Sequence, residues 1–124
     1  MSLRHPLARV KGAGPSGEGS HHWWLQRLSA LALIPLGLWF MFAVIRHLDD
    51  DYLTVSQWLA HPGVALGAVL FSAFMFFHAH LGVQVVIEDY VHNEATKMAC
   101  LLLSRTVMLV AGAASVFAIL SLAL

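Results

Sequence analysis

The sequence predicts an all-α membrane protein with three transmembrane helices, its N-terminus on the cytoplasmic side and its C-terminus on the opposite side. The first observation is compositional: 59% of the 124 residues are hydrophobic and only 11% are charged, against about a quarter in a soluble domain. The second is that the apolar residues form three long runs rather than amphipathic stripes. The third is that the basic residues are concentrated before the first run and after the second.

Residues 1–21 differ from the rest of the chain and are predicted to form a polar tail. They contain three basic residues, two of the four prolines and a Gly/Ser-rich stretch from Gly12 to Ser20. This composition is typical of an extended segment, which we interpret as a tail or a docking arm. A secretory signal is the alternative, but the apolar run that follows is too long for it and ends in acidic residues rather than a cleavage site.

The remaining residues, 22–124, are predicted to form one three-helix anchor domain. Its helices are expected at about 23–47, 58–90 and 94–123. In the first helix, only Ser29 is polar between Leu28 and Ile45. A helix of roughly 23 residues measures about 34 Å, which is enough to span a hydrocarbon core of about 30 Å. A kink at Pro35 would be tolerated in a bilayer.

The second and third helices carry their own sequence signals. Pro62 suits a first helical turn, where its missing N–H is not needed. Gly112, Ala113 and Ala114 in the third helix are candidate positions for close packing between helices.

The distribution of charge predicts the orientation. The segment before the first helix is basic, whereas the loop after it is acidic and holds only Arg46 as a basic residue. The positive-inside rule therefore places the N-terminus and the second loop on the cytoplasmic side, or on the matrix side in a mitochondrion. Arg27, Asp89 and Tyr90 are then expected at the same face of the membrane.

The composition also excludes several classes of protein. Seven Lys and Arg residues balance seven Asp and Glu residues, which leaves no excess charge for a basic patch that binds nucleic acid. The high hydrophobicity excludes a disordered chain. A single cysteine, Cys100, excludes an intrachain disulfide, and also an iron–sulfur cluster or structural zinc site that this chain ligates alone.

Two histidines near the middle of the second helix are the main candidates for chemistry, because polar groups inside a span are costly and usually functional. At about 100° per residue, His78 and His80 point about 200° apart, whereas His78 and Asp89 differ by only about 20°. Gly82 follows His78 by one turn, and this pair suits a flat macrocycle: the imidazole ligates the iron and the glycine lets the porphyrin approach. The spacing alone leaves open a histidine that bonds a neighbouring helix or relays protons. Zinc is disfavoured, since neither histidine has a second ligand three or four positions away.

Three polar residues at the ends of spans each have two interpretations. Tyr90 is either an interfacial belt residue or a hydroxyl that donates to a quinone carbonyl, with Asp89 orienting a neighbour or supplying protons. Arg27 either snorkels to lipid phosphates or pairs with a buried anion such as a heme propionate. Arg105 either snorkels or pairs with Glu88 or Asp89.

A longer match extends this interpretation. The segment from His78 to His92 resembles the second-helix signature of the small D-type membrane-anchor subunit of succinate dehydrogenase: a His, a Gly four positions later and an Asp-Tyr-Val that begins eleven positions after the His. The opening of the first helix, from Trp24 to Ala30, is also similar to that family. The resemblance covers residues 22–124. The chain departs from the family pattern at His80, where many relatives carry an apolar or aromatic residue.

The resemblance implies a non-catalytic membrane-anchor subunit of succinate:quinone oxidoreductase, the respiratory complex II that joins the tricarboxylic acid cycle to electron transport. A second three-helix cytochrome b anchor would share one heme b with this chain, and His78 would supply one axial ligand to the iron. Arg27 would contact a heme propionate, Tyr90 would belong to the ubiquinone site and Asp89 would lie beside it. FAD and the iron–sulfur clusters would belong to the flavoprotein and iron–sulfur subunits on the cytoplasmic face.

The expected location is the bacterial cytoplasmic membrane rather than the mitochondrial inner membrane. Two alternative functions stay open. A fumarate reductase anchor would serve the reverse reaction. The type of quinone and the growth conditions would distinguish it from a succinate dehydrogenase anchor. A small cofactor-free membrane accessory protein would use His78 only for packing, and its complex would lack a reduced b-type α-band.

Overall fold

The computed structural model of the chain describes residues 16–124, which form four α-helices and no strands. The helices are α2 (Ser16–Arg46), α3 (Tyr52–Leu59), α4 (Pro62–Tyr90) and α5 (Glu94–Ala123). Three of them, α2, α4 and α5, are long and apolar enough to cross a membrane. The prediction of an all-α membrane protein with three spans is therefore confirmed.

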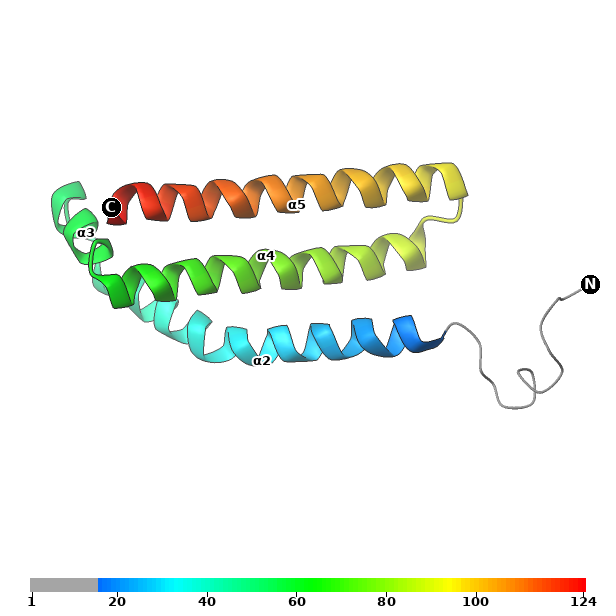
Figure 1. The fold of residues 1–124 in the computed structure, drawn as a ribbon, viewed down its shortest axis with the longest axis horizontal. Helices are drawn as coiled ribbons and strands as arrows, with labels where there is room; N and C mark the ends of the chain where they lie inside the picture. Colours follow the sequence, from blue (N-terminus) through cyan, green and yellow to red (C-terminus); the bar gives the residue numbers. More distant parts are fainter. Residues whose placement is uncertain (1–15) are drawn as a thin grey trace, which may run out of the picture.

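The three long helices lie side by side with alternating directions, and α4 is the middle one (Figure 1). Within the described residues, α2 and α5 each pack on α4 but not on each other. We call the end where α2 begins, α4 ends and α5 begins the N-terminal end of the bundle. Because the spans form one layer, α4 holds four of the buried residues whereas α5 holds none.

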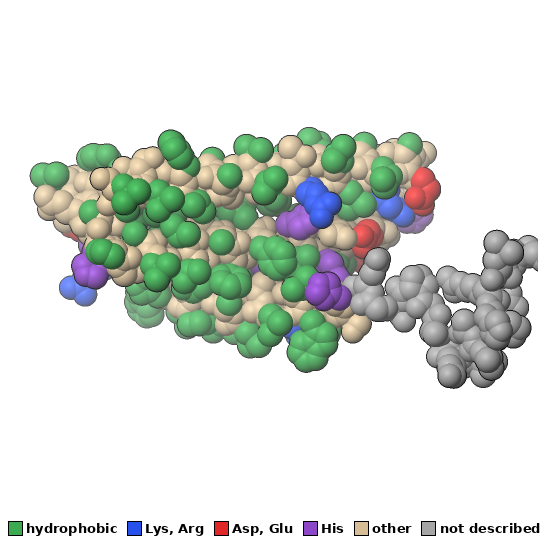
Figure 2. Space-filling view, viewed as in Figure 1, with side chains coloured by type: hydrophobic (Ala, Val, Ile, Leu, Met, Phe, Trp, Pro, Cys, Tyr) green, Lys and Arg blue, Asp and Glu red, His purple; other side chains and the backbone are tan. Residues whose placement is uncertain are grey.

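Most of the apolar surface therefore points away from the chain's own core. Figure 2 shows hydrophobic side chains over the middle of one face, with most of its charged and histidine side chains in the half near the N-terminal end. Such a large exposed apolar surface is expected where a protein meets lipid or another subunit.

Glycines bring the helices close together at two levels. A Cβ atom at Gly67 of α4 would lie 3.0 Å from the Trp39 ring of α2, and one at Gly112 of α5 would lie 3.4 Å from Phe76 Cβ. Small residues allow this close approach between spans. Of the three candidate packing positions in α5, Gly112 is confirmed, whereas Ala113 and Ala114 are exposed and do not pack between helices.

The second span begins later than the sequence predicted. Residues 58 and 59 belong to the separate helix α3, and α4 starts at Pro62. Proline disfavours a helical conformation in the residue before it, and His61 is accordingly extended, with φ −65° and ψ 125°. His61 also caps α4, because its Nδ1 accepts a hydrogen bond from the Gly63 backbone N–H at 3.2 Å.

The short helix α3 was not predicted. Asp51 caps it by accepting a hydrogen bond from the Thr54 backbone N–H at 2.9 Å, and the bonds from Thr54 hold the pKa of the Asp51 carboxyl below its usual value. Trp58 stacks on Trp39 of α2 with ring centroids 6.3 Å apart. Helix α3 therefore covers the end of the bundle opposite the N-terminal end (Figure 1).

Of the predicted polar tail, residues 1–21, positions 1–15 lie outside the described residues. From Ser16 the chain is already helical, so α2 begins before the predicted boundary. Pro35 lies inside α2, which continues through it to Arg46.

Candidate functional site

The most buried polar contact of the described chain joins the first and second spans. The Ser29 hydroxyl of α2 lies 2.9 Å from Nδ1 of His78 in α4, and it donates to the Gln26 carbonyl oxygen at 2.9 Å. Ser29 is only 2% exposed, the lowest fraction among the described side chains. Between residues 16 and 124, no other side-chain hydrogen bond connects two spans. His78 is therefore held against α2 at one defined level of the bundle.

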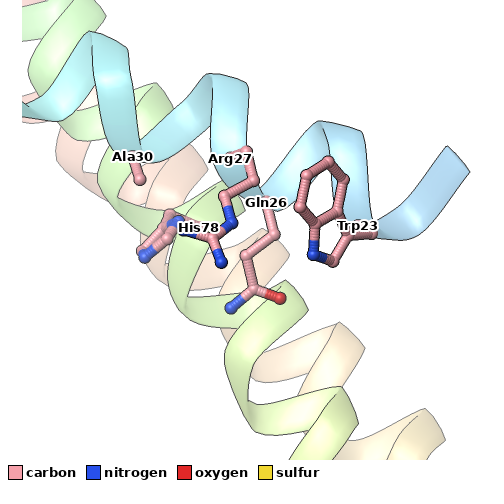
Figure 3. A pocket seen from close by; sticks show the side chains of 5 residues that line it. All are labelled: Trp23, Gln26, Arg27, Ala30 and His78. Atoms are coloured by element: carbon pink, nitrogen blue, oxygen red, sulfur yellow. The ribbon is translucent and has the colours of Figure 1, made fainter. Parts of the chain in front are cut away.

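His78 also lines a cavity of about 290 Å³ whose other walls come from α2. Trp23, Gln26, Arg27 and Ala30 form these walls, and Figure 3 shows their side chains beside that of His78. The cavity combines an imidazole, a guanidinium and an aromatic ring on one face of the two helices.

Arg27 is the positive group of this cavity. Its Cζ lies 5.2 Å from the centroid of the Trp23 ring, a cation–π geometry that positions the guanidinium. Within residues 16–124 Arg27 contacts no carboxylate; the salt bridge there is Lys97–Glu94, and His47 forms a hydrogen bond with Asp50. Arg27 is thus available to an anion from outside the described chain.

Gly82 is not explained by packing against the described residues, 16–124. A Cβ atom there would meet only Gln26 Nε2, at an ordinary distance of 3.9 Å, and no positive φ requires glycine. A glycine in a helix interior costs about 1 kcal/mol relative to alanine. The residue one turn after His78 therefore leaves room that no described residue fills.

His80 faces different neighbours from His78, as the helical phase predicts. It is not among the residues of the cavity, and its neighbours on the adjacent helices include Arg105 and His22. Nδ1 of His80, Nε2 of His22 and the hydroxyl of Ser104 are buried and have no hydrogen-bond partner in the described part of the chain. Arg105 is exposed and makes no ion pair there, so neither Glu88 nor Asp89 pairs with it.

Tyr90 and Asp89 lie apart from the cavity, at the last turn of α4. Tyr90 is twelve positions from His78, about 18 Å along a helix axis. Both residues are exposed, Tyr90 to 79%, and neither side chain has a hydrogen-bond partner among residues 16–124. The structure therefore brings His78 and Arg27 together, and leaves Tyr90 and Asp89 at the N-terminal end of the bundle.

A metal at His78 would need ligands from outside this chain. The described residues hold no group of three or more His, Cys, Asp or Glu side chains that could bind a metal ion. One imidazole with open space around it suits a macrocycle that brings its own four nitrogens better than it suits a bare ion.

A second, larger cavity lies at the opposite end of the bundle. Its volume is about 630 Å³, its lining is mostly apolar, and α3 closes one side with Trp58 and Leu59. It includes Ser72 of α4 but none of the predicted site residues.

Sequence reasoning missed Ser29, Gln26 and Trp23 as parts of the site. The available signal was Ser29, which is the only polar residue between Leu28 and Ile45. A polar side chain inside a span usually has a partner on a neighbouring helix. Trp23 belongs to the site because its ring lies under the Arg27 guanidinium.

Comparison with known proteins gives one consistent family. The family described as "Succinate dehydrogenase/Fumarate reductase transmembrane subunit" matches residues 1–120. A succinate dehydrogenase hydrophobic membrane anchor subunit of Rickettsia bellii is 33% identical over 72% of this chain and 71% of its own length. A succinate dehydrogenase membrane anchor subunit of Reclinomonas americana is 30% identical over 73% of this chain and 78% of its own length. The hydrophobic membrane anchor subunit of Paracoccus denitrificans is 30% identical over 76% and 73%. No solved structure gives a significant match.

Proposed function

The chain belongs to the succinate dehydrogenase/fumarate reductase transmembrane subunit family, and from this we propose that it is the D-type anchor of a succinate:ubiquinone oxidoreductase, respiratory complex II. It is not catalytic alone. With a second cytochrome b anchor it would bind heme b and form the site of ubiquinone reduction. The flavoprotein and iron–sulfur subunits, which carry FAD and the clusters, would dock at the N-terminal end of the bundle. We place that end on the cytoplasmic side of a bacterial inner membrane.

The cavity of His78 and Arg27 is the observation that carries this proposal. His78 would supply one axial ligand, and the second anchor the other. Arg27 has no anion partner among residues 16–124, and a heme propionate would provide one. Gly82 leaves room along the same stripe of α4, where the face of a macrocycle needs it. Heme b would supply one-electron redox chemistry at this position.

Tyr90 and Asp89 support the quinone part of the proposal. Their exposure at the last turn of α4 leaves both side chains open to groups that come from other subunits. The Tyr90 hydroxyl would donate to a quinone carbonyl oxygen, and Asp89 would assist proton supply. In this arrangement the quinone site lies at the same end as the docked iron–sulfur subunit, which delivers the electrons.

Affinity purification of the tagged chain from its native membrane tests the function. We expect a flavoprotein, an iron–sulfur protein and a second small anchor to co-purify, and a b-type α-band to appear on reduction. A chain that purifies without these subunits and without heme would instead be the cofactor-free accessory protein. Comparison of succinate oxidation by ubiquinone with fumarate reduction by a low-potential quinol then separates the succinate dehydrogenase from a fumarate reductase anchor.

Arg27→Leu is expected to weaken heme binding and to lower the heme midpoint potential. A charge-assisted hydrogen bond to a carboxylate is typically worth about 1.5–3 kcal/mol, and propionates without their cation favour the ferric state. The measurements are heme per flavin and a redox titration of the α-band. Arg105→Leu is the matched control, because Arg105 is also an unpaired arginine within a span but lies outside the cavity. Equal behaviour of the two variants would mean that Arg27 only snorkels to lipid.

A further inference from the structure

We infer that Ser29 is a positioning residue that fixes the tautomer of His78, so that Nδ1 carries the proton and Nε2 is the nitrogen that can bind a metal. The inference rests on the proposed function only for the identity of the metal group. It starts from the two hydrogen-bond distances that converge on the Ser29 hydroxyl.

A serine hydroxyl has one hydrogen and two acceptor lone pairs. Its oxygen lies 2.9 Å from the Gln26 carbonyl oxygen and 2.9 Å from His78 Nδ1. A carbonyl oxygen only accepts, so the hydroxyl hydrogen must lie between the two oxygens; otherwise their lone pairs would face each other at this distance. The hydroxyl oxygen is then the acceptor toward His78, and the hydrogen of that bond belongs to Nδ1.

The opposite tautomer of His78 would have one hydrogen bond fewer at the Ser29 hydroxyl. If Ser29 donated to an unprotonated Nδ1, the contact with the Gln26 carbonyl would become a repulsion between two oxygens, and one hydrogen bond would replace two. At 2% exposure, no water is available at Ser29 to restore the lost bond. The buried hydroxyl thus selects Nδ1–H and leaves the lone pair on Nε2.

This arrangement serves a metal ligand in two ways. A ligating histidine normally donates its other ring N–H to a hydrogen-bond acceptor, which fixes the ring orientation and raises the basicity of the ligating nitrogen. Here the acceptor, Ser29, comes from α2, which also carries Arg27. One helix would therefore orient the His78 ring through Ser29 and also provide the arginine that contacts a propionate. Gln26 lies three residues before Ser29 on α2, and its carbonyl oxygen sets the direction in which the Ser29 hydroxyl hydrogen points.

The test compares Ser29→Ala with Ser29→Thr, which keeps a hydroxyl able to bond the carbonyl three residues earlier. Ser72→Ala is the matched control, because Ser72 is also a buried serine but lines the other cavity. The purified complexes are mixed with excess apomyoglobin, and the rate of heme transfer is measured. The heme midpoint potential is measured by redox titration, and the g-values of the ferric heme by electron paramagnetic resonance.

For Ser29→Ala we expect heme transfer roughly 10- to 100-fold faster and a higher midpoint potential, because a less basic imidazole stabilises ferric iron less. Ser29→Thr and Ser72→Ala should resemble the wild type. If Ser29→Ala matches the wild type in transfer rate, potential and g-values, the inference is wrong while the proposed function stands.

A wild-type complex without heme would overturn the proposed function instead. The tautomer is then measured directly by ¹⁵N shifts of a histidine-labelled complex, with the His78 signals identified by their loss in His78→Gln. A protonated Nδ1 that loses its preference in Ser29→Ala supports the inference. A protonated Nε2 in the wild type contradicts it.

Discussion

His78→Ala is expected to abolish the b-type absorption of the purified complex while succinate oxidation by a soluble dye continues. The substitution removes the proposed axial ligand and also the only side-chain hydrogen bond between spans that the described residues contain. Loss of a hydrogen bond to a metal ligand alone lowers affinity by roughly 10- to 100-fold, so loss of the ligand itself should leave almost no heme. In the proposed complex the dye would take electrons from the flavoprotein and iron–sulfur subunits, which would not need this histidine. Heme per flavin and the dye-linked rate are the two measurements.

His80→Ala is the control, because it removes a histidine two positions away that faces other neighbours. We expect it to retain most of the heme. The reverse pattern, with heme lost in His80→Ala and kept in His78→Ala, would show that the helical phase assigns the wrong histidine. Both variants should be compared at equal flavoprotein content, since a hole at the α2–α4 contact also weakens the anchor.

The features that depend on local chain geometry could be predicted from the sequence. A span needs about 20 apolar residues, and three runs of that length stand out directly in this chain. The separation of His78 from His80 likewise depends only on the 100° turn per residue, which any regular helix imposes. The start of α4 was placed a few residues early because the apolar pattern continues across Pro62, whereas the proline itself marks the first turn.

The features that depend on how helices meet could not be predicted. Ser29 and His78 are 49 positions apart, and their contact follows from the register between α2 and α4. That register depends on close approaches such as Gly67 against Trp39, which a single sequence does not reveal. Helix α3 was missed for a related reason. Its eight residues are too few to form a stable helix alone, and contacts such as Trp58 with Trp39 stabilise it.

The layered arrangement explains why only half of the candidate site is assembled in this chain. A single row of spans has two open faces, so α4 can present His78 toward one side while Tyr90 in its last turn stays exposed. The cavity beside Arg27 is open, and the Tyr90 hydroxyl has no partner among residues 16–124. Both features fit a subunit whose sites are completed by neighbours, which is the role we propose.

Tyr90→Phe is expected to lower quinone reductase activity by about tenfold, the rate equivalent of one lost hydrogen bond of about 1–1.5 kcal/mol. The substitution keeps the ring, its packing and its interfacial position, and removes only the hydroxyl. A quinone carbonyl becomes more negative as it is reduced, so a donor fixed at that oxygen stabilises the transition state more than the ground state. Dye-linked succinate oxidation and heme content should stay near the wild-type values, because neither depends on this hydroxyl.

Tyr52→Phe is the matched control for this prediction. Tyr52 is the other tyrosine of the chain and is similarly exposed, 75% against 79%, but it begins α3 at the opposite end of the bundle. We expect Tyr52→Phe to reduce ubiquinone at the wild-type rate. The assay is run at limiting and at saturating ubiquinone, since a donor that acts mainly in the transition state lowers kcat as well as kcat/KM. If Tyr90→Phe equals Tyr52→Phe at both concentrations, the Tyr90 hydroxyl does not contact the quinone and the residue is only an interfacial anchor.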